Sequence, residues 1–453
     1  MPTAVPPPVP IGLLTPGTGF PVQAHIRDIL HDRIPLGAPE ITLLSSPPML
    51  RLERIQQLGF VSRIWPGAKH ARYEHSIGVF HLARRAVEQL MRTPAGNSIT
   101  IEDARTLAAA ALLHDIGHYP FSHAIEELGP PIAPHETVGR AVILADPIAR
   151  VLRAEWHVSP ARVAAIVAPG QDDLKPVDRL LRGVLSGPLD VDKLDYLPRD
   201  AQGCGVPYGG VDTSRLIDSL RIATPEDASE PRIAIDAKGV SPLHSLINAR
   251  QEMFDNVYWH HTNRACMVML LRAVQEALIA GVISSDNFTL LDDAGTLAAL
   301  AKPGMPETTR RLTEALTNRW LHKRAIEFSS AAPEIYARLS QLFSEPRRRR
   351  EVEISMSRRL AEYIGQPVNP EAILIDIPKP EKWRTDVLVV FDQPPVGFCH
   401  QMPWREVVGL TDEDFKRFEE RRRLIRIVCQ PSLRDVVRQR WESLLVPALG
   451  GAL

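Results

Sequence analysis

The sequence predicts a mostly α-helical protein, with a helical core and a smaller C-terminal α+β domain. Apolar residues recur with the helical period over several long segments that precede position 285. An alanine-rich run at 107–113 has high helix propensity and lets neighbouring helices approach closely. Short segments rich in β-branched residues gather in the last third of the chain, which favours a mixed domain there.

Composition limits the class of protein. Of 453 residues 44% are hydrophobic, and the 53 Lys and Arg almost balance the 54 Asp and Glu. This length suits two or three domains, or one large helical body with an appended domain. The balance of charge gives no general grip on nucleic acid or membrane. No apolar run is long enough to span a membrane, and the start of the chain lacks the features of a signal peptide.

Cysteine usage points to a reducing compartment. The four cysteines are far apart and match neither a zinc motif nor a dense disulfide framework. They are Cys204, Cys266, Cys399 and Cys429. We therefore expect a cytoplasmic protein.

The first third of the chain is expected to be an arm followed by helices. Five prolines within residues 1–10 exclude an early helix, so 1–44 should hold an extended arm and short elements. The Ser46-Pro47-Pro48 signal predicts a helix that Gly59 ends. A turn at Pro66-Gly67 precedes a second predicted helix, from Arg72 to about Met91.

The central helix is the organising element. Thr100 and Asp103 form a capping signal for it, and its apolar run ends in the polar stretch 114–118. A short helix with Glu126 and Glu127, a proline-rich loop and further helices through 136–186 should follow.

Beyond residue 186 the pattern is mixed. We expect a charged and aromatic segment at 188–200, a glycine-rich loop at 203–211, a small hairpin at 231–239 and a long helix from Ser241 to about Ala280.

The C-terminal region, 286–453, should begin with helices that persist to about 363. The basic run 347–350 is interpreted as a solvated face, with a nucleic-acid or effector patch as the alternative. Strands are predicted at 372–377, 385–390 and 424–429, within an α+β domain at about 325–453.

Four side chains are candidates to bind one divalent metal ion. They are His75, His114, Asp115 and Asp192. Adjacent helical residues diverge by about 100°, so His114 and Asp115 can converge only at the end of a helix. Any single histidine could instead be structural, but polar groups in an apolar helix are costly unless paired or bound. Mixed imidazole and carboxylate ligands suit Mn²⁺, Fe²⁺, Zn²⁺, Ni²⁺ or Mg²⁺, and the sequence leaves that choice open.

Five motifs together resemble the HD-domain superfamily of metal-dependent phosphohydrolases, and more narrowly the deoxynucleoside triphosphate triphosphohydrolases. In order they are Arg72–Gly78, Leu113–His118, Phe121–His123, His135-Glu136 and Asp190–Tyr196. The match covers about 45–275. It implies an HD core at 45–285, a homo-oligomer, and the same four metal ligands.

The resemblance also implies roles for the other site residues. His118, His123 and His135 match histidines that stabilise or protonate the phosphoryl region, and Glu126 stands where the family usually has an orienting Asp. The positions that match phosphate-contacting residues are Arg72, Lys193 and Arg250. Tyr196 and Asp200 match residues that hold the 3′-hydroxyl, while Gln57, Leu58 and Tyr258 match the sugar and base pocket.

Some positions depart from the family. Ser45 and Glu53 stand where vertebrate members carry the Asp and Arg of a nucleotide activator site, which argues against guanine nucleotide activation through that site. The base-facing position is Trp259, and His261 replaces an expected Lys.

The function expected from these residues is hydrolysis of a deoxynucleoside triphosphate (dNTP) to deoxynucleoside and triphosphate. Phosphate-ester hydrolysis needs neutralisation of the charge on the non-bridging phosphate oxygens, a positioned water and a proton for the leaving oxygen. Metal, cationic side chains and histidines of the kinds present here supply these. The alternatives are an HD phosphohydrolase acting on nucleoside monophosphates or cyclic or signalling nucleotides, or a catalytically silent nucleotide-binding regulator.

Overall fold

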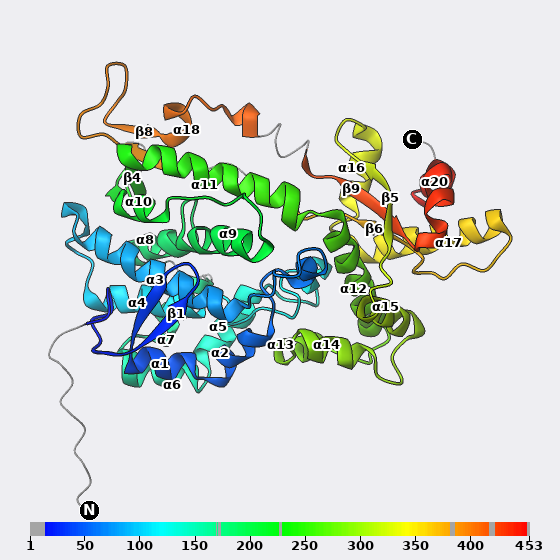
Figure 1. Cartoon of the computed structure of the whole chain (residues 1–453), viewed down its shortest axis with the longest axis horizontal. Helices are drawn as coiled ribbons and strands as arrows, with labels where there is room; N and C mark the ends of the chain where they lie inside the picture. The colour runs from blue at the N-terminus through cyan, green and yellow to red at the C-terminus, as the bar shows by residue number, and fades with distance from the viewer. Residues whose placement is uncertain are drawn as a thin grey trace, which may run out of the picture.

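Helices surround the central helix α4 (Ile101–Leu113), as Figure 1 shows for the computed structural model. The structure describes residues 14–168, 170, 174–225, 229–380, 386–415 and 422–450. Helix α4 is buried from Ala108 to Leu113, and the small alanines let α3 (Arg72–Met91) and α7 (Pro160–Val167) pack against it. Helix α9 (Val191–Cys204) also packs on α3. The mostly helical fold class is confirmed.

Capping fixes the start of the central helix. Thr100 Oγ1 accepts a hydrogen bond from the Asp103 amide at 3.1 Å, and Asp103 Oδ2 accepts one from the Thr100 amide at 2.8 Å. This reciprocal pair satisfies amides that the first turn would leave free. The predicted bounds of α3, at Arg72 and Met91, are confirmed as well.

The helix predicted to run from Pro47 to Gly59 is wrong. The chain forms α2 (Pro47–Arg51) and a 3₁₀ turn (Leu52–Arg54), then becomes extended at Ile55. The Gln56 amide donates to Asp293 Oδ2 at 3.0 Å and the Gln57 amide to the His70 carbonyl at 3.0 Å. These tertiary partners replace the helical ones. A second 3₁₀ turn, Gly59–Arg63, follows.

The long helix predicted from Ser241 is divided in two. Helix α11 (Val240–Met253) ends in a π-helical turn (Phe254–Tyr258), and α12 (His261–Ile279) begins after a break at Trp259 and His260. The side-chain amide of Asn263 donates to the Tyr258 carbonyl at 3.0 Å, which satisfies an acceptor that the break leaves free. The break places Tyr258 and Trp259 on a cavity.

A short hairpin and further helices complete the core. Strands β1 (Val22–Asp28) and β2 (Asp32–Gly37) form this antiparallel hairpin. Residues 1–13 of the arm expected within 1–44 lie outside the described residues. The other core helices are α1 (Ala38–Leu44), α5 (His135–Leu144), α6 (Ile148–Val151), α8 (Pro176–Leu185) and α10 (Thr213–Asp218), with 3₁₀ turns at Pro94–Gly96, Ile125–Leu128 and Ala237–Gly239 and a π turn at Leu152–Trp156.

One small sheet joins the core to the C-terminal part of the chain. Its order is β3 (Leu220–Ala223), β4 (Arg232–Asp236), β7 (Leu388–Val390) and β8 (Gln401–Pro403). Strands β4 and β7 run parallel and the other pairs are antiparallel. The hairpin predicted within 231–239 is therefore wrong, because β4 pairs with two strands from outside that segment.

The second sheet belongs to the C-terminal region at the right of Figure 1. Strand β9 (Ile425–Cys429) lies between β5 (Lys323–Phe328) and β6 (Ile373–Asp376), all antiparallel. The strands predicted near 373, 388 and 425 are confirmed, although residue 385 lies outside the described residues. Strand β5 falls in a stretch predicted as helical, so that prediction is wrong there.

The remaining helices cover this sheet or connect it to the core, except α18, which packs on β7 and β8 of the first sheet. They are α13 (Ser285–Leu290), α14 (Asp293–Leu300), α15 (Glu307–Thr317), α16 (Pro333–Gln341), α17 (Pro346–Ile364), α18 (Trp404–Val407) and α20 (Arg434–Ala448), with a 3₁₀ turn at Pro431–Leu433. A separate apolar cluster packs α16, α17 and α20 on the sheet. In the described part of the chain no helix combines the length and apolar character that crossing a membrane requires.

The basic run at the start of α17 is not simply a solvated face. Arg349 is buried at 5% exposure, and Arg350 Nε pairs with Glu276 Oε1 on α12 at 2.6 Å. The interpretation fails for these two residues because the first turn of α17 packs on α12, where Gln275 donates to the Pro346 carbonyl.

The contact of α3 with α9 leaves no room for a side chain at Gly78. A Cβ atom there would overlap the Asp195 carboxylate and lie 2.5 Å from an Arg199 nitrogen. We expect Gly78→Ala to lower the free energy of unfolding by about 1–3 kcal/mol, as overpacking typically does. Urea unfolding measures this. Gly183→Ala is the matched control, because its Cβ would meet Ile233 at 3.5 Å, an ordinary contact. Equal midpoints for the two variants would contradict the prediction.

Candidate metal centre and active site

One cavity of about 2040 Å³ collects every site residue predicted from the sequence. They come from segments that are far apart along the chain. Those lining it are Gln57, Leu58, Arg72, His75, His114, Asp115, His118, His123, Glu126, His135, Asp192, Lys193, Tyr196, Asp200, Arg250 and Tyr258.

Three of the four predicted metal ligands form a tight group in this cavity. His75 comes from the first turn of α3, His114 follows the last residue of α4, and Asp192 lies in the first turn of α9. Asp192 Oδ1 is 3.0 Å from His75 Nε2 and 3.7 Å from His114 Nε2. One potential ligand atom from each residue lies within 4.8 Å of the others. We call His75, His114 and Asp192 the cation group.

Contacts behind the two imidazoles fix their orientation. His75 Nδ1 is 2.9 Å from Asp195 Oδ2, and His114 Nδ1 is 2.8 Å from the Ala111 carbonyl oxygen. Each Nδ1 therefore donates to the group behind it, and each Nε2 faces the other members of the cation group. Burial lowers the pKa of His75, but its hydrogen bonds with Asp192 and Asp195 outweigh this and raise it to about 10. The two carboxylates thus concentrate negative potential at this point.

Asp115 lies beside the cation group but is held by an arginine. Its Oδ1 is 3.4 Å from His114 Nε2, and its Oδ2 is 3.8 Å from His75 Nε2. Arg72 binds Oδ2 at 2.5 Å, and this guanidinium holds the pKa of Asp115 well below its usual range despite the raising effect of burial. The carboxylate stays ionised and faces both imidazoles.

The residues present fit a divalent cation. His114 Nε2 is buried and makes no close hydrogen bond among the described residues, because the Asp115 and Asp192 oxygens lie 3.4 and 3.7 Å away; this is a costly arrangement unless the group binds something. Two imidazoles with carboxylates form a borderline donor set that suits Mn²⁺, Fe²⁺, Zn²⁺ or Ni²⁺. His75, His114 and Asp192, with Asp115 beside them, are the residues that would hold it.

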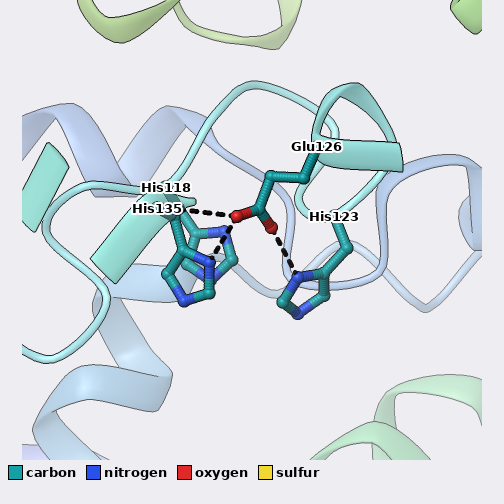
Figure 2. A group of neighbouring side chains, drawn as sticks. All are labelled: His118, His123, Glu126 and His135. Atoms are coloured by element: carbon teal, nitrogen blue, oxygen red, sulfur yellow. Dashed lines mark hydrogen bonds and ion pairs between the residues drawn. The ribbon is translucent and has the colours of Figure 1, made fainter. Parts of the chain in front are cut away.

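Figure 2 shows a second group, in which a carboxylate connects histidines. Glu126 Oε2 is 3.0 Å from His123 Nδ1, and Glu126 Oε1 is 2.9 Å from His135 Nδ1. The His118 and His135 rings stack at 3.8 Å. We call His118, His123, Glu126 and His135 the histidine–glutamate group. The reach of a glutamate side chain lets one carboxylate hold two imidazoles.

The environment sets the charge states in this group. Burial, then Arg72 and His135, lower the pKa of His118 well below its usual range, so its imidazole is neutral. The hydrogen bonds from His123 and His135 hold the pKa of Glu126 far below its usual range, although burial alone would raise it. His118 Nε2 is also 3.2 Å from Asp115 Oδ1, so the two groups adjoin.

The predicted sugar pocket is anchored on Asp200. Tyr258 Oη donates to Asp200 Oδ2 at 2.7 Å, and His70 Nε2 lies 2.8 Å from Asp200 Oδ1. The Tyr196 and Tyr258 rings meet edge to face at 6.4 Å. Asp200 is 1% exposed, so these partners fix the orientation of its carboxylate.

The predicted phosphate cations differ in their surroundings. Lys193 Nζ is 2.5 Å from Asp190 Oδ2 and donates to the Gly187 carbonyl at 3.0 Å. Arg72 binds Asp115 and donates from Nε to Ser122 Oγ at 3.0 Å, so its clearest role is to hold neighbouring groups in place. Arg250 lies on the cavity wall.

Sequence reasoning missed several residues that support the site. Arg199 donates to both oxygens of Asp195, at 2.8 and 2.9 Å. His31, from the β1–β2 turn, lies 2.8 Å from Asp195 Oδ1. Asp195 and Ser122 lie inside motifs that were recognised, so proximity to those motifs was an available signal. His31 lies far from Asp195 in the sequence and carried no such signal.

Two family models match the chain. The HD domain matches residues 72–181, and the HD associated region matches residues 211–397. These ranges contain the cation group's first two ligands and the π turn with Tyr258.

Individual proteins are also similar. An uncharacterized protein of Methanocaldococcus jannaschii, MJ1154, is 31% identical over 306 residues, which is 67% of this chain and 60% of that protein. The deoxynucleoside triphosphate triphosphohydrolase SAMHD1 of Homo sapiens is 28% identical over 290 residues, 56% of this chain and 46% of that protein. The chain therefore matches less than two thirds of these relatives' lengths. A crystal structure of a hypothetical protein from Aquifex aeolicus covers 93% of this chain and 100% of its own at a TM-score of 0.68 and 26% identity.

The cation group predicts a specific effect on metal affinity. We expect Asp192→Asn to weaken Mn²⁺ binding by at least about 10-fold, because the amide keeps the shape and loses the charge that lies 3.0 Å from His75. Isothermal titration calorimetry on metal-stripped protein measures it. Glu136→Gln removes a carboxylate elsewhere on the cavity wall and should bind Mn²⁺ like the wild type. Unchanged affinity of Asp192→Asn would remove this residue from the site.

Proposed function

We propose that this chain, which contains an HD domain and an HD associated region and so belongs to the HD-domain proteins, is a metal-dependent phosphohydrolase. Its proposed reaction is the cleavage of dNTPs to deoxynucleoside and triphosphate. The observation that carries the proposal is the joint presence of the cation group, the histidine–glutamate group and the Asp200–Tyr258 pair on one cavity. The named activity of the SAMHD1 relatives supports the same choice of substrate. On the same resemblance we infer a homo-oligomer.

The reaction requires attack of water on the α-phosphorus and departure of the 5′-oxygen of the deoxynucleoside. The new P–O bond forms as the P–O5′ bond breaks; the attacking water gives up one proton, and the leaving oxygen takes up one. A divalent cation at the cation group would neutralise charge on the phosphate oxygens and polarise the α-phosphorus.

The histidine–glutamate group is suited to supply that proton. Glu126 accepts from His123 Nδ1, which leaves Nε2 of this exposed imidazole to carry a proton toward the leaving oxygen. His135 is fixed by the same carboxylate and stacks on neutral His118, which lies close to Asp115. Arg72 keeps Asp115 ionised beside the reacting phosphate.

The sugar pocket would select the nucleoside. Asp200, held by Tyr258 and His70, is a buried carboxylate on the cavity wall, and it suits a hydroxyl donor such as the 3′-OH. Tyr196 and Trp259 add aromatic surface to the wall for the sugar and base.

Product analysis tests the proposal directly. Purified enzyme with Mn²⁺ should convert at least one dNTP to deoxynucleoside and triphosphate, separated by anion-exchange chromatography. Asp192→Asn is the control for contaminating activity and should give no product. Release of monophosphate and pyrophosphate, or turnover confined to monophosphates or cyclic nucleotides, would favour another HD phosphohydrolase. Tight nucleotide binding without turnover under several metals would favour a silent regulator.

The 3′-hydroxyl contact gives a second prediction. Hydrogen bonds to charged groups contribute about 1.5–3 kcal/mol, so kcat/KM for a dNTP should exceed that for its 2′,3′-dideoxy analogue by about 10- to 100-fold. Asp200→Asn should erase most of this preference, as measured by steady-state kinetics with both substrates. Asp212→Asn, an exposed carboxylate at the start of α10, should keep it. A preserved preference in Asp200→Asn would place the 3′-OH elsewhere.

A further inference from the structure

The carboxylate of Asp293 joins two segments that line the proposed active site, although the residue comes from outside the HD-domain match. Asp293 is the first residue of α14. Its Oδ1 accepts the Phe121 amide at 2.7 Å, and its Oδ2 accepts the Gln56 amide at 3.0 Å. Each oxygen thus holds one backbone amide, and the two amides belong to segments that are distant in the sequence.

The first of these segments carries the histidines. Phe121 and Ser122 have φ angles of 58° and 59°, a left-handed conformation that side-chain-bearing residues disfavour. Such backbone persists only where its surroundings hold it. The bond from the Phe121 amide to Asp293 acts directly on this turn, between His118 and His123 of the histidine–glutamate group.

The second segment carries the predicted sugar and base pocket. Gln56 directly precedes Gln57 and Leu58, and it pairs with Ala71, the residue before Arg72. Ser122 Oγ lies 2.8 Å from the Gln56 carbonyl oxygen and 2.9 Å from that of Gln57, so the two segments also touch each other. Their spacing sets the distance between the pocket and the histidines.

Neighbouring contacts attach α13 and the residue that follows it, just before α14, to the site. Arg51 donates to the carbonyl of His118 at 3.0 Å and to the carbonyls of Leu291 at 2.9 Å and Phe288 at 3.3 Å. Asp292, in contrast, caps α14 through the Gly295 amide and forms an ion pair with the exposed side chain of Arg54, without binding a backbone amide of either segment.

We propose that Asp293 is a positioning residue for the phosphohydrolase reaction, holding the histidine-bearing turn and the sugar-pocket segment at the spacing that the substrate requires. The expected effect on kcat/KM rests on the proposed function. Asp293 does so as a carboxylate, because each of its two oxygens accepts one of the amides. An asparagine offers one acceptor and turns an NH₂ group toward the other amide.

The kinetic test compares Asp293→Asn with Asp292→Asn. A displacement of about 1 Å can cost on the order of 100-fold in rate, so kcat/KM for the best dNTP should fall about 10- to 100-fold in Asp293→Asn. Mn²⁺ affinity should not change, because the cation group lies on other elements. Asp292→Asn removes the same charge one residue away and should keep wild-type kcat/KM. Equal losses in both variants would reduce Asp293 to a support of α14 and overturn the proposal.

The pH profile supplies a readout that a purely structural role would not move. The pKa of Asp293 is raised to about 6. Burial and the charge of Asp292 raise it, and the two amides and Arg72 partly oppose them; Arg51 is the other charge nearby. Protonation makes one oxygen a donor facing an amide, so wild-type kcat/KM should fall as the pH drops through 6. Asp293→Asn should lack this step, and an unchanged step in the variant would contradict the proposal.

Hydrogen–deuterium exchange separates this inference from the proposed function. Peptides containing Gln56 and Phe121 should exchange faster in Asp293→Asn than in Asp292→Asn, whatever the substrate. If the wild type cleaves no dNTP, the proposed function fails, and the exchange result alone decides whether Asp293 holds both segments. Unchanged exchange, or faster exchange with wild-type kcat/KM, would overturn the inference.

Discussion

The site depends on one buried contact, in which His75 lies between the carboxylates of Asp192 and Asp195. A buried ionised carboxylate is stable only when it is paired, and a buried imidazole keeps one orientation only when its second nitrogen is occupied. Asp195 meets both conditions by binding His75 and Arg199 together. The close packing of α3 on α9 at Gly78 brings these groups near enough to pair.

Charge pairing continues outward from this contact. Arg199 reaches Asp28 at 2.9 Å and His31 reaches Asp195, so the β1–β2 hairpin helps to enclose the carboxylates behind the cation group. A second set of ion pairs lies near the histidine–glutamate group, where Arg264 of α12 binds Glu127 at 2.8 Å and Asp376 of β6 at 2.6 Å. Because Glu127 follows Glu126, these pairs connect the histidine–glutamate group to the C-terminal sheet.

The supporting elements explain why the cavity needs more than the HD-domain segment. Residues 72–181 supply two members of the cation group and all of the histidine–glutamate group. Asp192 and the two residues of the proposed sugar pocket, Asp200 and Tyr258, come from later helical segments. Asp293 and Arg264 then fix loops of that segment from outside. The break between α11 and α12 also shapes the cavity, because a continuous helix would point Tyr258 and Trp259 in a different direction.

The sequence alone determined the helical class, the bounds of α3, the cap of α4 and the identity of the residues that meet in the cavity. Those features follow from local signals: apolar period, capping side chains, and polar motifs in an apolar setting. Tertiary structure decided the rest. The segment 52–58 leaves the helix because Asp293 and His70 offer its amides distant partners, and β7 joins the core sheet because β4 offers it an edge. The roles of His31, Asp195 and Asp293 depend on contacts across long sequence separations, and no local pattern encodes which distant group will satisfy a buried charge or amide.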